Sequence, residues 1–120
     1  MLDELVARRR RGEPLAWVIG FTEFCGIRVR VDHGVYVPRP QTEALARRAA
    51  SLLPADGIAV DLCTGSGAVA VVMRSARPNA TVLATDSDDA AIACARSNGV
   101  TALLGDLDGP LPSQVAGRVD

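Results

Sequence analysis

The chain has 120 residues, of which 48% are hydrophobic and 3% aromatic, a size that normally means one small domain with an aliphatic core. Thirteen basic and fourteen acidic residues leave a net charge of -1, which argues against nucleic acid or a membrane surface as a partner. Cys25, Cys63 and Cys94 are widely spaced and His33 is the only histidine, so no metal site is expected. The sequence shows neither the apolar run of a signal peptide nor an apolar stretch of about 18 residues, and we expect a cytoplasmic protein.

The first elements predicted are a short helix and a hairpin. Apolar residues at helical spacing near the N-terminus predict a helix that ends near Gly12. Residues 27–31 alternate apolar and basic side chains and predict a half-exposed strand. Residues 32–34 are a turn signal and residues 35–37 predict a second short strand, so these segments together predict the hairpin.

A proline-rich segment and a longer helix follow. Residues 38–40 must be extended, because proline disfavours the helical region in the residue before it. A helix is then predicted from about residue 42 to residue 53, and the apolar residues on one of its faces are Ala44, Leu45, Ala49 and Leu52. We expect Trp17 and Tyr36 to be core or interface residues.

The second half of the chain predicts alternating strands and helices. The predicted strands are 58–62, 81–84 and 100–104, and the predicted helices are 68–76 and 89–97. This order is typical of the first half of a doubly wound, Rossmann-like α/β sheet. Right-handed crossover connections would make its three strands parallel. We expect 58–62 to be a buried parallel strand. The chain therefore divides into residues 1–53 (helix, hairpin and pre-core helix) and 54–120 (a partial Rossmann-like domain).

Each of the three predicted strands leads into a loop that carries an acid, and ligands of such sheets bind at these strand ends. Asp61 precedes the glycine turn 65–67, where the backbone can pass close to a ligand and the next helix offers free N–H groups. Asp86 can accept both hydroxyl hydrogens of a ribose. Asp106 can accept from an exocyclic amine, beside Leu107, which can pack on a base.

Two cofactors compete for this pattern. Residues 65–70 fit the Gly-x-Gly-x-x-Ala form of the dinucleotide fingerprint, and Asp86 follows about twenty residues later. Asp61 would repel a pyrophosphate, however, whereas it can bind the amino group of a zwitterionic methionine. The loop 61–67 is also wider than a dinucleotide turn. These features favour S-adenosylmethionine over NAD.

The chain resembles a known family over nearly its whole length. Residues 58–107 look like motifs I to III of class I methyltransferases. Residues 11–20 (RGEPLAWVIG), 23–27 (EFCGI) and 37–43 (VPRPQTE) resemble the HemK-type protein-glutamine N5-methyltransferases. That family methylates the glutamine of the Gly-Gly-Gln loop in peptide-chain release factors. At Gln41 the family usually has Glu.

The resemblance implies a cofactor site, a substrate pocket and a protein partner. The residues implied for S-adenosylmethionine are Asp61, Leu62, Cys63, Thr64, Gly65, Gly67, Asp86, Ser87, Asp106 and Leu107. The residues implied at the substrate pocket are Pro38, Arg39, Pro40, Thr42 and Glu43. The implied reaction is methyl transfer to a glutamine side-chain amide nitrogen of a protein, such as a release factor.

The family's catalytic signature, Asn-Pro-Pro-Tyr, does not occur in these 120 residues, and residues 117–120 resemble the approach to a fourth strand. We therefore expect a truncated enzyme without catalytic residues, inactive by itself, which self-associates through its open sheet edge. Two alternatives stay open. One is a non-catalytic cofactor-binding or interaction module, and the other is a fragment of an NAD-dependent oxidoreductase.

Overall fold

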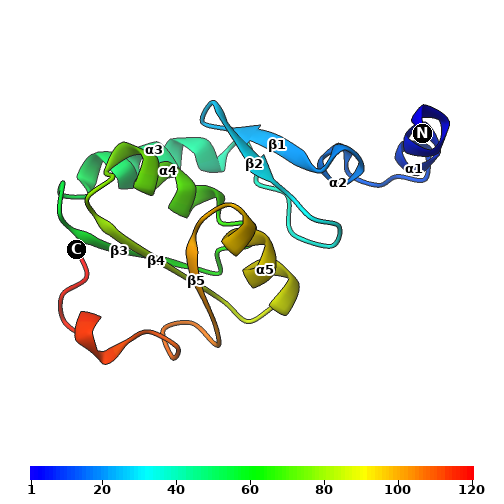
Figure 1. Cartoon of the computed structure of the whole chain (residues 1–120). Coiled ribbons are helices and arrows are strands. Elements are labelled where there is room, and N and C mark those ends of the chain that lie inside the picture. The colour runs from blue at the N-terminus through cyan, green and yellow to red at the C-terminus, as the bar shows by residue number, and fades with distance from the viewer.

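The computed structural model describes residues 1–120 and contains a two-stranded and a three-stranded sheet (Figure 1). In chain order the elements are α1 (Leu2–Arg10), α2 (Leu15–Ile19), β1 (Phe21–Phe24), β2 (Ile27–Arg30), α3 (Thr42–Leu52), β3 (Ile58–Leu62), α4 (Ala68–Ala76), β4 (Thr81–Asp86), α5 (Asp89–Ser97), β5 (Thr101–Leu104) and the 3-10 helix η1 (Ser113–Val115). In Figure 1, α3 and α4 lie above the three-stranded sheet and the segment after β5 passes below it. No helix has both the length and the apolar character needed to span a membrane.

The three-stranded sheet has the order β3-β4-β5, and all its strands are parallel. Helices α4 and α5 connect them, so the predicted β-α-β-α-β half-sheet is confirmed. Asp61 is in register with Ala84, and Asp86 with Leu104. Because parallel strands end at the same edge, this register places the two carboxylates on neighbouring strands at the carboxyl edge of the sheet.

The expectation that β3 is a buried strand is wrong. It lies at the edge of the sheet, and all five of its residues are at least partly exposed, whereas the central strand β4 buries Leu83, Ala84 and Thr85. At the start of the β3 edge, the Asp120 N–H donates to the Ile58 carbonyl at 2.8 Å, and the Ile58 N–H donates to Asp120 Oδ2 at 2.8 Å. The C-terminal residue therefore lies beside β3, and self-association through this edge stays a prediction.

The hairpin pairs different strands from those predicted. Strand β2 confirms the predicted strand at 27–31, but its antiparallel partner is β1, with Phe24 opposite Ile27. Cys25 and Gly26 form the two-residue turn between them, and both have positive φ angles, 50° and 74°. A turn with two such residues matches the right-handed twist of paired strands. Residues 35–37, predicted to be a strand, have no strand structure.

Residues 32–37 instead form a turn and an extended segment packed under α2. The Val35 N–H donates to the Asp32 carbonyl at 3.0 Å, as expected for the predicted turn. Trp17 Nε1 donates to the Val35 carbonyl at 2.8 Å. Val35 is 1% exposed and packs in a small core with Ala16, Val31 and Cys94. The short helix α2, which was not predicted, therefore holds this segment in place.

Helix α3 has the predicted bounds within one residue, but the apolar face expected for it is wrong. The helix buries Ala46 and Ala50, whereas Leu45 and Leu52 are 63% and 65% exposed. Ala44 is also exposed, and Ala49 is partly buried. The small alanines let α3 pack closely on α4. The residues of this shared core are Phe24, Val29, Ala46, Ala50, Leu53, Ala68, Val72 and Met73, so the hairpin and α3 pack directly on the parallel sheet's first crossover helix.

Candidate functional site

A cavity of about 360 Å³ opens at the carboxyl ends of β3 and β4. It lies within the size range of small-molecule sites, although near the lower end. One wall comes from the end of β1 and from the segment 36–42, and the other comes from the β3–α4 loop, the start of α4 and the end of β4. Its lining residues are Phe24, Tyr36, Pro38, Arg39, Thr42, Asp61, Cys63, Thr64, Gly65, Ser66, Ala68, Val69 and Asp86.

In the loop between β3 and α4, every second residue from Cys63 to Gly67 has a positive φ angle. The φ angles of Cys63, Gly65 and Gly67 are 57°, 58° and 85°. Glycine adopts such angles without strain. At Gly67 there is a second requirement, because a Cβ atom there would lie 2.9 Å from Val100 Cγ2. This glycine therefore lets α4 begin in close contact with Ala95 of α5 and with Val100, the residue before β5.

Asp86 holds this loop to the neighbouring strand. Its Oδ2 accepts from the Gly65 N–H at 2.9 Å, and its Oδ1 accepts from the Asp88 N–H at 3.0 Å. The Thr64 N–H also donates to the Thr85 carbonyl at 2.9 Å. A carboxylate oxygen can accept more than one hydrogen bond, so Asp86 can still accept from a ligand hydroxyl. Its position at the cavity is fixed before any ligand binds.

The cap of α5 is Asp88, whose side chain accepts from the Ala90 N–H at 3.3 Å. Asp86 therefore does not cap that helix. Its carboxylate is used by the cavity loop and by the turn before α5.

Asp61 is the second carboxylate of the cavity. Its Oδ2 accepts from the Thr64 hydroxyl at 2.6 Å. Burial raises the pKa of Asp61, hydrogen bonds from the Thr64 hydroxyl and the Ala70 backbone N–H oppose that shift, and the nearby negative charge of Asp86 adds to it. A partly desolvated carboxylate beside a second one favours a cationic ligand group and disfavours a phosphate.

The N-terminus of α4 offers the opposite charge preference. The N-cap residue, Gly67, has no side chain that could cap the helix, and the first helical residues, Ala68 and Val69, line the cavity. Uncapped N–H groups and the positive end of the helix dipole attract anions. An ammonium can therefore bind Asp61 while a carboxylate binds the start of α4, which is the charge pattern of a zwitterionic amino acid.

Several residues expected at the cofactor do not line this cavity. These residues are Leu62, Gly67, Ser87, Asp106 and Leu107. Leu62 is 45% exposed and lines a different surface cavity, with Val119. Asp106 and Leu107 are exposed after β5, although the preceding Gly105 N–H donates to the Asp86 carbonyl at 2.9 Å. The loop after β5 therefore adjoins the cavity without its acid facing it.

Of the residues expected at the substrate pocket, Pro38, Arg39 and Thr42 line the cavity, whereas Pro40 and Glu43 do not. Pro40 and Glu43 face another surface cavity next to β1. The Glu43 carboxylate accepts from the Cys25 N–H, which ties the hairpin turn to α3. Glu43 is thus engaged in a structural contact behind the cavity wall.

Five lining residues were not expected at the cofactor or the substrate: Phe24, Tyr36, Ser66, Ala68 and Val69. Tyr36 was expected to be a core or interface residue; at 65% exposed it is not a core residue, and an interface role stays a prediction. Arg39 Nε donates to the Tyr36 hydroxyl at 3.1 Å, so the two side chains form one wall. The position of Tyr36 just before the Pro38–Pro40 segment was the signal that could have placed it there.

Residues 27–104, more than half of the chain, match the family model described as methyltransferase small domain. The chain belongs to the methyltransferase small domain family. The solved structure of precorrin-6y C5,15-methyltransferase from Geobacter metallireducens superposes on this chain with a TM-score of 0.52 and 16% identity. The match covers 68% of this chain and 46% of the Geobacter chain. At that identity the likeness shows the fold alone, and it agrees with a partial Rossmann-like methyltransferase sheet.

Among curated relatives of this methyltransferase small domain are several release factor glutamine methyltransferases. The protein of Neisseria gonorrhoeae is 46% identical over 96 residues, which cover 80% of this chain and 35% of that protein. The protein of Mycolicibacterium smegmatis is 40% identical over 124 residues, which cover 98% of this chain and 44% of that protein. These matches confirm the resemblance to the glutamine methyltransferases. The chain spans less than half the length of either relative.

Proposed function

We propose that this chain binds S-adenosylmethionine in the cavity at the carboxyl ends of β3 and β4. The observation that carries the proposal is the pair of carboxylates on adjacent parallel strands, Asp61 and Asp86, beside the uncapped start of α4. Asp61 would hold the ammonium of the methionine part, and the N–H groups at the start of α4 would hold its carboxylate. Asp86 would accept hydrogen bonds from the ribose hydroxyls.

The same charges argue against NAD. A pyrophosphate bound at the start of α4 would lie beside the partly desolvated Asp61. Burial and the charge of Asp86 raise the pKa of Asp61, and the same two causes disfavour a further negative charge at this place. Arg39 is the only basic residue that lines the cavity, and its guanidinium is directed to the Tyr36 hydroxyl. A dinucleotide would therefore lack a cation at its most charged group.

We further propose that the chain is the cofactor-binding part of a protein-glutamine N5-methyltransferase whose substrate is a peptide-chain release factor. The names of the curated relatives and the similarity of residues 11–43 support this assignment. When bound, the cofactor would supply an electrophilic methyl group. Pro38, Arg39 and Thr42 form the wall opposite the β3–α4 loop, and would exclude water and shape the approach of the acceptor amide. A release-factor substrate would place the protein in the cytoplasm.

A chimera tests the glutamine assignment. This chain replaces the aligned segment of the Mycolicibacterium smegmatis relative, and transfer of tritiated methyl groups to a purified release factor is measured. The proposal predicts labelling of the release factor, no labelling when the glutamine of its Gly-Gly-Gln loop is changed to alanine, and at least about a tenfold lower rate with Asp61→Asn. A folded chimera that binds S-adenosylhomocysteine but does not label the release factor would contradict the assignment.

A further inference from the structure

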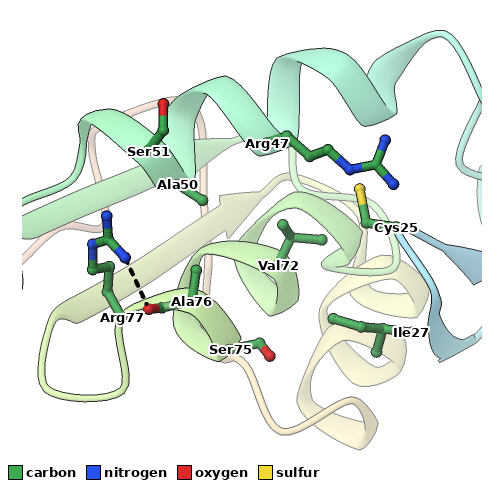
Figure 2. A pocket seen from close by; sticks show the side chains of 9 residues that line it. All are labelled: Cys25, Ile27, Arg47, Ala50, Ser51, Val72, Ser75, Ala76 and Arg77. Atoms are coloured by element: carbon green, nitrogen blue, oxygen red, sulfur yellow. Dashed lines mark hydrogen bonds between the residues drawn. The ribbon is translucent and has the colours of Figure 1, made fainter.

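A second cavity, of about 420 Å³, lies between α3 and α4 (Figure 2). Its lining residues are Cys25, Ile27, Arg47, Ala50, Ser51, Val72, Ser75, Ala76 and Arg77, and we call it the α3–α4 groove. None of these residues lines the cavity at the strand ends. The groove is therefore a separate surface feature, and a ligand bound there would not depend on the cofactor site.

The α3–α4 groove combines an apolar floor with a cation at each end. Ala50 and Val72 are each 6% exposed and form the middle of the floor. In Figure 2, Arg47 lies at one end of the groove, near Cys25, and Arg77 lies at the other. No acidic residue lines it. The groove thus concentrates positive charge on a chain whose net charge is -1.

The two arginines are available to a ligand in different ways. Arg77 is fixed by the protein, because its Nε donates to the Leu53 carbonyl at 2.9 Å and its Nη1 donates to the Ala76 carbonyl at 3.1 Å. A guanidinium has five N–H donors, so Arg77 keeps donors free while its position is set. Arg47 takes part in none of the ion pairs of the chain and is exposed. Neither cation is neutralised by a carboxylate.

We propose that the α3–α4 groove binds an acidic segment of a partner protein, with an apolar side chain on the floor and a carboxylate at each arginine. Arg47 precedes Leu53 by six residues, about 9 Å along the helix axis, and its side chain runs further away from Arg77 (Figure 2). In an extended segment, residues at positions one, three and five face the same side, and the outer two lie about 13 Å apart. The pattern Glu-x-Leu-x-Glu therefore spans more than the distance of about 9 Å between Arg47 and Leu53, and it matches the groove in charge.

The composition of the groove disfavours nucleic acid as its occupant. Single-stranded nucleic acids bind through aromatic side chains that stack on bases, together with several cations along the phosphates. No aromatic residue lines the α3–α4 groove, and its two cations stand at opposite ends of an apolar floor. A peptide with two carboxylates around a leucine satisfies this arrangement, whereas a chain of phosphates leaves the floor unused.

The test is a fluorescence anisotropy titration of the full 120-residue chain into a labelled peptide, Gly-Glu-Ser-Leu-Ser-Glu-Gly. The proposal predicts saturable binding that Arg47→Gln weakens about two- to fivefold, as expected for one exposed ion pair. The peptide with both glutamates changed to glutamine should bind more weakly still, and added salt should weaken the acidic peptide alone. Arg48→Gln is the matched control, since Arg48 is its exposed neighbour on α3 and does not line the groove.

Three results would overturn the proposal. The first is equal binding of the glutamate and glutamine peptides, and the second is an equal effect of Arg47→Gln and Arg48→Gln. The third is the absence of saturable peptide binding up to about 1 mM, the weakest affinity at which a specific site is useful. A short single-stranded RNA is titrated in parallel, and RNA binding without peptide binding counts against the proposal as well.

Discussion

Asn98 and Ser66 are joined by a hydrogen bond of 2.8 Å from the Asn98 side-chain Nδ2 to the Ser66 carbonyl. The same side chain also pairs with the edge of β2, because its Oδ1 accepts from the Arg30 N–H at 2.8 Å and its Nδ2 donates to the Arg30 carbonyl at 2.9 Å. Ser66 belongs to the loop that lines the strand-end cavity. One residue after α5 therefore anchors both the hairpin and the cavity loop.

Removing this anchor should affect stability and ligand binding together. Asn98→Ala leaves the Ser66 carbonyl and the Arg30 N–H without their side-chain partner, although the Arg30 carbonyl still accepts from Cys94 Sγ. We expect a loss of about 1–3 kcal/mol in the free energy of unfolding. The cavity loop loses its support as well, and the affinity for S-adenosylhomocysteine should fall. Urea unfolding and calorimetric titration measure the two effects. Ser97→Ala is the control, because the Ser97 hydroxyl bonds only to the exposed Ala93 carbonyl. Wild-type values of both quantities in Asn98→Ala would show that the residue is not an anchor.

Binding of S-adenosylhomocysteine should depend on pH through Asp61. Burial raises the pKa of Asp61, so this carboxyl is protonated at a pH where an ordinary one is ionised. A neutral carboxyl cannot pair with an ammonium, and the affinity should fall as the pH drops through that raised pKa. Calorimetry between about pH 4 and pH 7 measures the profile. Asp61→Asn should bind weakly and lose the pH dependence, and an unchanged profile in this variant would rule out Asp61 as the ammonium partner.

The raised pKa of Asp61 also predicts the direction in which the stability of the ligand-free chain changes with pH. The unfolded chain ionises this group at a lower pH than the folded chain does, so the folded protein binds more protons between the two pKa values. The contribution of Asp61 to the free energy of unfolding therefore falls as the pH rises through this window. Urea unfolding of wild type and Asp61→Asn at several pH values measures the difference. A wild-type stability that rises relative to Asp61→Asn over the window would contradict this sign.

Thr85→Val should stabilise the chain. The Thr85 side chain is 0% exposed, and its Oγ1 has no hydrogen-bond partner in the protein. Replacing a buried, unpartnered hydroxyl by a methyl group of similar shape removes its desolvation penalty, and we expect a gain of about 1 kcal/mol. Thr81→Val, at the exposed start of β4, should change stability by less than about 0.5 kcal/mol. A less stable Thr85→Val would mean that the hydroxyl has a partner, such as a bound water.

Gly67→Ala should be costly for two separable reasons. A residue other than glycine is strained at φ 85°, and the new Cβ would lie 2.9 Å from Val100 Cγ2. We expect a loss of about 1–3 kcal/mol from strain, with a further loss from the close contact. Gly12→Ala is a matched control, since Gly12 has φ 93° and open space around its Cβ position. Equal losses in the two variants, measured by urea unfolding, would show that the approach of Val100 is unimportant.

The sequence was sufficient to predict the parallel half-sheet, because its strands and helices alternate at clear boundaries and its acids follow the strands. It misled us at the hairpin. The turn Cys25-Gly26 carries a cysteine where asparagine or aspartate is the usual signal of two left-handed residues, so the local sequence does not mark the turn between β1 and β2. The buried face of α3 was also mispredicted, because close packing on α4 selected the small Ala46 and Ala50 over the larger leucines.

The candidate site could be predicted only in part. Asp61, Gly65 and Asp86 were expected from the strand-end pattern, and the structure brings them together at one cavity. Tyr36 and Phe24 reach the same cavity from the hairpin and its following segment. The position of Tyr36 beside the Pro38–Pro40 segment was a usable signal, whereas the contact of Phe24 depends on tertiary packing that no local sequence pattern encodes. The same holds for Asn98, which lies outside the cavity and acts through backbone groups of distant residues.

The central claim is that the strand-end cavity binds S-adenosylmethionine, and calorimetric titration of the purified chain with S-adenosylhomocysteine tests it most directly, with NAD titrated as the control. We predict saturable binding of S-adenosylhomocysteine, strongly weakened by Asp61→Asn, and no binding of NAD. Binding of NAD alone, or of neither compound by a folded chain, would contradict the claim.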